Sequence, residues 1–238
     1  MSDTTTYDRY FEEGSRLSGV PVAIYRTIAR RESGGDPTLI NPRTRATGLM
    51  QIMPVVREGW NRRVATPRGK VALREKDLLD PQTNVAVASW LMRDILTTFA
   101  RFPGLFTDWD DRRSVELFIF GYHAGHYGLA KAVERMVSHG VTTKNIGLGD
   151  VLRVGKAIGA FPYAKDDPAL LDTIAAYDRK TADLYFGTPT PRMTPSRPAL
   201  AGTPRKAPGL GALLGLGAAV ALGIAIAGKR REEGALAT

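Results

Sequence analysis

The sequence predicts an all-α domain with at most minimal β structure, followed by a C-terminal transmembrane helix. Apolar residues recur at spacings of three and four along several segments, as they do on the buried face of an amphipathic helix. No stretch of useful length alternates apolar and polar residues with the period of two that a half-buried strand requires. Residues 209–228 carry no charged side chain, and roughly 20 such residues span a bilayer core as a helix.

The composition indicates a soluble globular part and an acidic partner. With 238 residues, 43% of them apolar and 24% charged, the chain is long enough to bury a core in one domain of moderate size. The absence of cysteine excludes a disulfide framework, thiol catalysis and a cysteine metal site. The net charge of +9 favours cell-wall polymer, anionic lipid or nucleic acid as a partner, and charge alone does not choose among them.

Shifts in composition divide the chain into five parts: a polar segment at 1–19, a globular domain at 20–187, a linker rich in Pro and Thr at 188–208, the apolar segment at 209–228 and a tail at 229–238. The first part contains no apolar run, so we do not interpret it as a secretory signal peptide. The tail begins with three basic residues, which favour the cytoplasmic side of a membrane. The alternative for the apolar segment is a low-complexity Gly/Ala tail that never inserts.

Glu32 is the first candidate for catalysis. Tyr25, Ile28 and Glu32 follow one another at helical spacing, which places a carboxyl group on the buried face of its own helix. Burial favours the neutral acid and raises its pKa toward working pH, which is the condition that a general acid needs. A structural ion pair with a neighbouring arginine is the alternative. Gly48, in the loop that follows, allows the close backbone approach that a cleft beside the acid would need.

The motifs around Glu32 resemble those of the soluble lytic transglycosylase family, whose fold is similar to goose-type lysozyme. Glu32-Ser33 is followed, after a loop rich in Gly and Pro, by Gly48-Leu-Met-Gln-Ile-Met-Pro54. Asp80-Pro81-Gln-Thr-Asn84 and Gly121-Tyr-His-Ala-Gly125 then resemble two further motifs in the family's order, with His123 where the family has Asn. The resemblance covers residues 20–186 and implies a helical, lysozyme-like domain.

The resemblance also implies roles for individual residues. Glu32 would be the catalytic acid and base, Asn41 would orient Glu32 or the acetamido group, and Tyr177 on the final helix would hydrogen-bond Glu32. The residues implied to bind substrate are Asn41, Met50, Gln51, Met53, Tyr122, His123 and Tyr177, with Tyr122 and His123 in an N-acetyl pocket. For Met50 and Met53, plain core packing is the alternative.

We expect no cofactor and no metal ion. His123 and His126 are three residues apart, but no third ligand follows nearby in the sequence. Ordinary glycosidases use two carboxylates, and the motif segments offer no second one beside Glu32. The resemblance implies instead that the N-acetyl group of the substrate assists and that Glu32 activates the 6-hydroxyl of the same sugar.

These observations predict a peptidoglycan lytic transglycosylase that cleaves the β-1,4 bond between N-acetylmuramic acid and N-acetylglucosamine and releases a 1,6-anhydro product. The polar start, the linker and the apolar segment suggest a bacteriophage virion protein that opens the host wall during genome delivery. Its partners would be peptidoglycan strands, the lipid bilayer through residues 209–228 and other virion proteins, with no specific nucleic acid. It would reside in the virion and the host cell envelope.

Two other functions remain open. The first is a membrane-anchored structural or conduit protein whose lysozyme-like domain only binds glycan, which the His123 substitution allows. The second is a goose-type lysozyme that uses water. Glu32 and Gln51 favour catalysis over binding alone.

Overall fold

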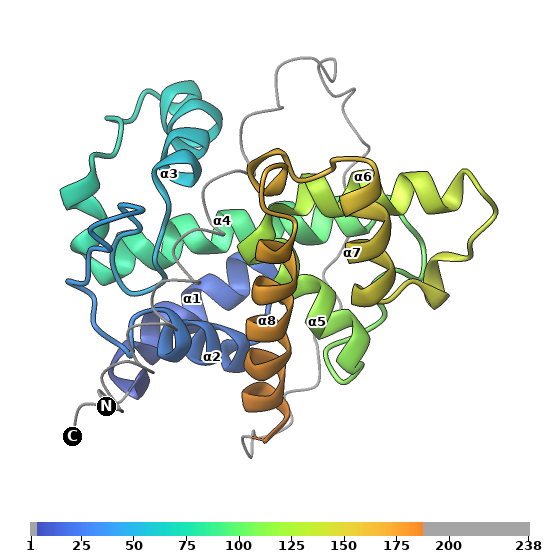
Figure 1. Cartoon of the computed structure of the whole chain (residues 1–238). Helices are drawn as coiled ribbons and strands as arrows, with labels where there is room; N and C mark the ends of the chain where they lie inside the picture. Colours follow the sequence, from blue (N-terminus) through green and yellow to red (C-terminus); the bar gives the residue numbers. More distant parts are fainter. Residues whose placement is uncertain (1–3, 188–238) are drawn as a thin grey trace, which may run out of the picture.

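The computed structural model describes residues 4–187, and their regular structure is helical throughout (Figure 1). The α-helices are α1 (Asp8–Ser18), α2 (Val22–Glu32), α3 (Pro54–Trp60), α4 (Pro81–Phe99), α5 (Arg112–Phe120), α6 (His126–Val137), α7 (Leu148–Ala157) and α8 (Ala169–Gly187). Shorter 3-10 and π helices are η1 (Thr4–Tyr7), η2 (Asn61–Ala65), η3 (Thr66–Arg68), η4 (Glu75–Leu79), η5 (Gly121–Gly125), η6 (Thr143–Asn145) and η7 (Pro162–Ala164). The predicted all-α class is therefore confirmed for this part of the chain.

The minimal β structure allowed for in the prediction lies in the loop between α2 and α3. Two isolated antiparallel bridges join Thr47 to Ile40 and to Ile52. No helix within residues 4–187 is long and apolar enough to cross a membrane. The predicted linker at 188–208, the transmembrane segment at 209–228 and the tail at 229–238 all lie outside the described residues.

The globular fold begins before residue 20, where the sequence analysis placed the start of the domain. Helix α1 packs against α2 and α4, and the ring of Phe11 is fully buried and stacks 5.8 Å from that of Tyr25. Gly14 permits this approach, because a Cβ there would lie 2.6 Å from Oγ of Ser89. A helix that buries one aromatic side chain and small residues shows no apolar run, so its sequence alone does not predict its place in the core.

Helix α4 is the central element of the core. It is capped by Asp80, whose Oδ2 accepts a hydrogen bond of 2.8 Å from the Thr83 backbone, and Pro81 occupies its first turn. It contacts α1, α3, α6 and η5. Its apolar face lies within the hydrophobic core; the fully or almost fully buried members are Val85, Ala88, Met92, Ile95 and Phe99.

The loop between α2 and α3 is anchored on the start of α4. The buried side chain of Asn84 accepts from Met50 N and donates to Thr47 O and Leu78 O, each at 2.8 Å. Gly48 has a φ of 79°, and a Cβ there would lie 2.3 Å from Leu78 O. The close approach predicted at Gly48 is therefore made to the chain at the start of α4, which holds the loop in place beside the end of α2.

Candidate active site

Glu32 is the last residue of α2, and its side chain is 11% exposed. Ser33 follows it, and the Ser33 hydroxyl donates to Leu49 O at 2.9 Å, which joins the end of α2 to the loop. Both close polar neighbours of the Glu32 carboxyl group lie at Oε1: the Tyr177 hydroxyl at 3.1 Å and Nε2 of His123 at 3.0 Å. Among the described residues no hydrogen bond is formed to Oε2, which makes this oxygen the candidate to meet a substrate.

Tyr177 comes from α8, the orange helix in Figure 1, which packs against α2, α5 and η5. Its hydroxyl lies 3.0 Å from Arg31 O and 3.1 Å from Oε1 of Glu32, and it can donate to either. The Arg31 guanidinium lies 4.2 Å from the centre of the Tyr177 ring. Burial, with the nearby Glu32 carboxyl group, raises the pKa of Tyr177, so the phenol stays protonated. The structure thus places Tyr177 at Glu32, the contact that the resemblance implied.

His123 lies in η5, a π-helix between α5 and α6, and its side chain is 1% exposed. Its Nδ1 lies 2.5 Å from Oδ1 of Asp178, and its Nε2 faces Glu32. Burial alone would lower the pKa of His123, but Asp178 and then Glu32 outweigh it and raise that pKa to about 10. A pKa raised in this direction favours the protonated imidazole at neutral pH.

Asp178 is the functional candidate that the sequence analysis did not identify. It is on α8 and fully buried, and its neighbours on the same helix face, Ile174, Ala175 and Ala182, are buried as well. An acidic residue on an apolar helix face is the same signal that led to Glu32. The signal was present at Asp178, but no motif accompanied it.

Tyr122 does not offer its hydroxyl to an N-acetyl pocket in this structure. Its side chain is buried, and the hydroxyl donates to Met50 O at 2.9 Å. Burial raises the pKa of Tyr122 far above its usual range. His123 is equally enclosed. The two residues therefore connect η5 to the loop and to Glu32. The N-acetyl pocket implied for them stays a prediction.

Met50 and Met53 are buried in the hydrophobic core, as in the core-packing alternative. Gln51 lies between them with a φ of 46°, and its Nε2 donates to Gly48 O at 2.9 Å and to Leu39 O at 3.1 Å. Its side chain thus closes the loop on itself. The methionine side chains, which the resemblance implied would contact glycan, are not exposed in this structure.

Asn41 caps a turn of the same loop, and its side-chain hydrogen bonds are made within that loop rather than to Glu32. Its Oδ1 accepts from the backbone of Arg43 at 3.0 Å and of Thr44 at 3.1 Å, as Asn does in an Asx turn. The side chains that do reach Glu32 are those of His123 and Tyr177. The orienting role that the resemblance implied for Asn41 stays a prediction.

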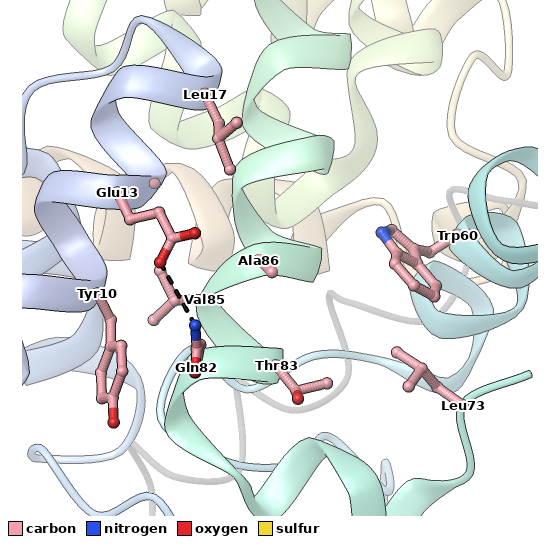
Figure 2. A pocket seen from close by; sticks show the side chains of 10 residues that line it. Tyr10, Glu13, Leu17, Trp60, Leu73, Gln82, Thr83, Val85 and Ala86 are labelled. Carbon is pink, nitrogen blue, oxygen red and sulfur yellow. Dashed lines mark hydrogen bonds between the residues drawn. The ribbon is translucent and has the colours of Figure 1, made fainter. Parts of the chain in front are cut away.

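A groove elsewhere shares no residue with this site. It has a volume of about 220 Å³ and lies between α1 and α4, with Trp60 and Leu73 on its other side (Figure 2). Gln82 and Glu13 approach each other across it at 3.5 Å. Its lining is mainly apolar and contains no cluster of acid and base groups.

The site can transfer a proton through one carboxyl group. The second nearby carboxyl, Asp178, is fully buried behind His123 and cannot reach a substrate, so the pair of substrate-facing carboxylates of ordinary glycosidases is not formed by Glu32 and Asp178. Within residues 4–187, no three His, Asp or Glu side chains are arranged to hold a metal ion.

A comparison with protein families finds a match that covers this site in part. The family model described as the transglycosylase SLT domain matches residues 9–141, more than half of the chain. The matched region contains Glu32, the loop with Gln51 and the whole of η5, and it ends before α8, which carries Tyr177 and Asp178. No curated protein matches the chain.

Proposed function

The chain belongs to the transglycosylase SLT domain family, and we propose that it cleaves the β-1,4 bond between N-acetylmuramic acid and N-acetylglucosamine with release of a 1,6-anhydro product. Family membership itself gives a peptidoglycan-cleaving activity of the lytic transglycosylase type. The observation that carries the finer proposal is the isolation of Glu32: one carboxyl group is available to substrate, and its Oε1 is held by two side chains.

The reaction requires Glu32 to act first as acid and then as base. Glu32, protonated on Oε2, donates to the glycosidic oxygen as the bond to C1 breaks. The resulting carboxylate takes the proton of the 6-hydroxyl as O6 attacks C1, and the N-acetyl group assists, as the resemblance implies. One carboxyl group suffices for both steps, which agrees with Asp178 lying out of reach of substrate.

The test is digestion of purified peptidoglycan by the full-length chain, followed by mass spectrometry of the released muropeptides. We expect anhydromuropeptides from the wild type and a loss of roughly 10²- to 10⁴-fold in Glu32→Gln, the range of general acid–base effects. Glu12→Gln, on the exposed face of α1, is the matched control and should retain activity. Reducing ends in place of anhydro ends would identify a hydrolytic lysozyme. Glycan binding without release by the folded wild type would favour the binding-only alternative.

A location in the phage virion and the host cell envelope is a separate part of the proposal. It is supported by the uncharged segment 209–228 of the sequence, which lies outside the described residues. We expect the full chain to float with liposomes and a chain ending at residue 208 to stay in solution. Flotation of neither would remove the lipid partner. Detection of the chain by mass spectrometry of purified phage particles would test the virion assignment.

A further inference from the structure

We propose that His123 and Asp178 are positioning residues that compensate the charge on Glu32: Asp178 holds the His123 imidazolium, whose Nε2–H stabilises Oε1 after Glu32 has given up its proton. This inference rests on the proposed function, because it concerns the acid of that reaction. His123 contacts both Glu32 and Asp178, Asp178 contacts His123 but not Glu32, and neither residue touches the reacting atoms.

The geometry links three elements that are far apart in sequence. Glu32 ends α2, His123 lies in η5 and Asp178 lies on α8; the contacts are 3.0 Å from Oε1 to Nε2 and 2.5 Å from Nδ1 to Oδ1. The contact to Glu32 has the distance of an ion pair without the alignment of a hydrogen bond. Such contacts often align only when substrate is bound.

The charges in this chain of contacts balance. Burial raises the pKa of Asp178, and the adjacent His123 counters this effect. When Asp178 is ionised and His123 is protonated, the pair is neutral, so Glu32 can hold its proton without a net charge beside it. When Glu32 ionises, the imidazolium is adjacent to the new charge in a site with almost no exposure to water, where such attraction is strong. If residue 123 were Asn, the buried Asp178 would lose the cationic partner that His123 Nδ1 provides. The residue types at positions 123 and 178 therefore depend on each other.

The other titratable groups that face His123 do not replace it. Arg31 of α2 lies over the Tyr177 ring, and its guanidinium acts on Asp178 from a distance. The surrounding phenols stay neutral because burial raises the pKa of each; they are Tyr122 of η5, Tyr163 of η7 and Tyr177 of α8. On the side of α4 and α6, Asp94 contacts His126 and Arg63 rather than His123.

The proton balance of the reaction leaves His123 unchanged. The proton on Oε2 passes to the glycosidic oxygen, which keeps the electron pair of the broken bond to C1. O6 forms the new bond to C1, and its proton returns to Glu32. The imidazolium keeps both of its protons throughout, and its role is to lower the energy of the state in which Glu32 is a carboxylate.

The charge on His123 can be measured without turnover. The chain has three histidines, so the imidazole resonances of isotopically labelled full-length protein are assignable by substitution. We expect His123 to stay protonated through pH 8 in the wild type and to titrate near its ordinary pKa in Asp178→Asn. A neutral His123 at pH 7 in the wild type would overturn the proposal.

The catalytic consequence is measured from pH–rate profiles. In Asp178→Asn we expect kcat to fall roughly 100-fold with KM little changed, and a new ionisation to appear near neutral pH. The double variant His123→Gln with Asp178→Asn contains no buried charge at these positions and should lose that new ionisation. Near-UV circular dichroism establishes that each variant is folded, and Asp94→Asn, the same substitution in the other His–Asp pair, should leave the profile unchanged.

The outcomes separate this inference from the proposed function. A profile of unchanged shape and an unchanged kcat in folded Asp178→Asn would reduce the pair to a structural ion pair. An inactive wild type with a protonated His123 would instead refute the proposed function. A neutral His123 in an active wild type would refute the positioning role alone.

Discussion

Two histidines, one on either side of Gly125 in the sequence, each pair with an aspartate from another helix. The inner pair joins His123 to Asp178, and the outer pair joins Nε2 of His126 to Oδ2 of Asp94 at 3.3 Å. Both imidazoles are buried, with side-chain exposures of 1% and 5%. The two pairs therefore use the same residue types in the same short segment, and they differ in what surrounds them.

The carboxyl group of the outer pair also meets an arginine, whereas the imidazole of the inner pair lies between two carboxyl groups. Asp94 is 15% exposed and also meets Arg63 at 2.9 Å and the Tyr127 hydroxyl at 3.0 Å. Burial would raise the pKa of Asp94, but His126 and then Arg63 lower it to about 2. His123 instead lies between two carboxyl groups, which raise its pKa to about 10. The outer pair therefore fastens α6 to α4, whereas the inner pair presents a cation to Glu32.

The largest expected effect distinguishes the pairs by stability. Asp178→Ala leaves the buried His123 without its partner at Nδ1, so we expect the free energy of unfolding to fall by about 3–5 kcal/mol. Asp94→Ala should cost less, because Asp94 is partly exposed and water can replace it. Urea unfolding followed by tryptophan fluorescence measures both. Equal losses would show that the pairs do not differ in the way described.

Gly125→Ala should disturb both pairs at once. Gly125 joins η5 to α6 and has a φ of 91°, a backbone conformation that residues other than glycine rarely adopt. We expect a loss of about 1–3 kcal/mol in the free energy of unfolding. Gly149→Ala is the matched control, since an added Cβ there meets no atom within 4 Å and its helical backbone accepts alanine. A Gly125→Ala protein as stable as this control would contradict the expectation.

The inner pair should make stability fall as pH rises. The folded pKa of His123, about 10, lies above its ordinary value of 6.5, so its contribution is complete below pH 6.5 and is lost as pH rises through 10. The slope from this group is at most about 1.4 kcal/mol per pH unit. Urea midpoints between pH 6.5 and 10 measure it. The double variant His123→Gln with Asp178→Asn should show a flatter dependence, and an identical slope would count against the assignment.

The outer pair should affect the stability of the protein at acidic pH. The folded pKa of Asp94 is lowered from 3.8 to about 2, so its contribution is present above pH 4 and is lost as pH falls through 2. Asp94→Asn should cost about 1 kcal/mol at pH 7 and weaken this acid dependence. Acid-unfolding curves test it, with Asp166→Asn at an exposed position as the control. A wild-type acid dependence retained in Asp94→Asn would exclude Asp94 as its source.

Much of the fold could be predicted because helical periodicity is a local property of the sequence. The all-α class follows from spacing, and Glu32 at the end of its helix follows from spacing and from the glycines after it. The sequence of helix α1 predicts a polar segment, because Phe11 is its one large fully buried side chain. Its place in the domain depends on the fit of Gly14 against Ser89, which no local pattern contains.

The candidate site was less predictable because its roles depend on contacts between distant elements. Tyr177 does reach Glu32, but Tyr122 and Met50 are used to hold the loop. Asn41 and Gln51 bond to the loop's own backbone. A polar residue near a catalytic acid in sequence can bind substrate or fasten the backbone, and only the position of its hydrogen-bond partners distinguishes the two.

By itself, the sequence determined the helical class, the identity of the candidate acid and the family to which its motifs belong. Only the tertiary structure decided which groups surround that acid, because Asp178 and His123 are 55 residues apart and Tyr177 and Glu32 are 145 apart. Helix periodicity records which residues face inward. The charge that a buried residue carries depends on the residues that other helices bring within about 3 Å of it, and those are set by how the helices pack.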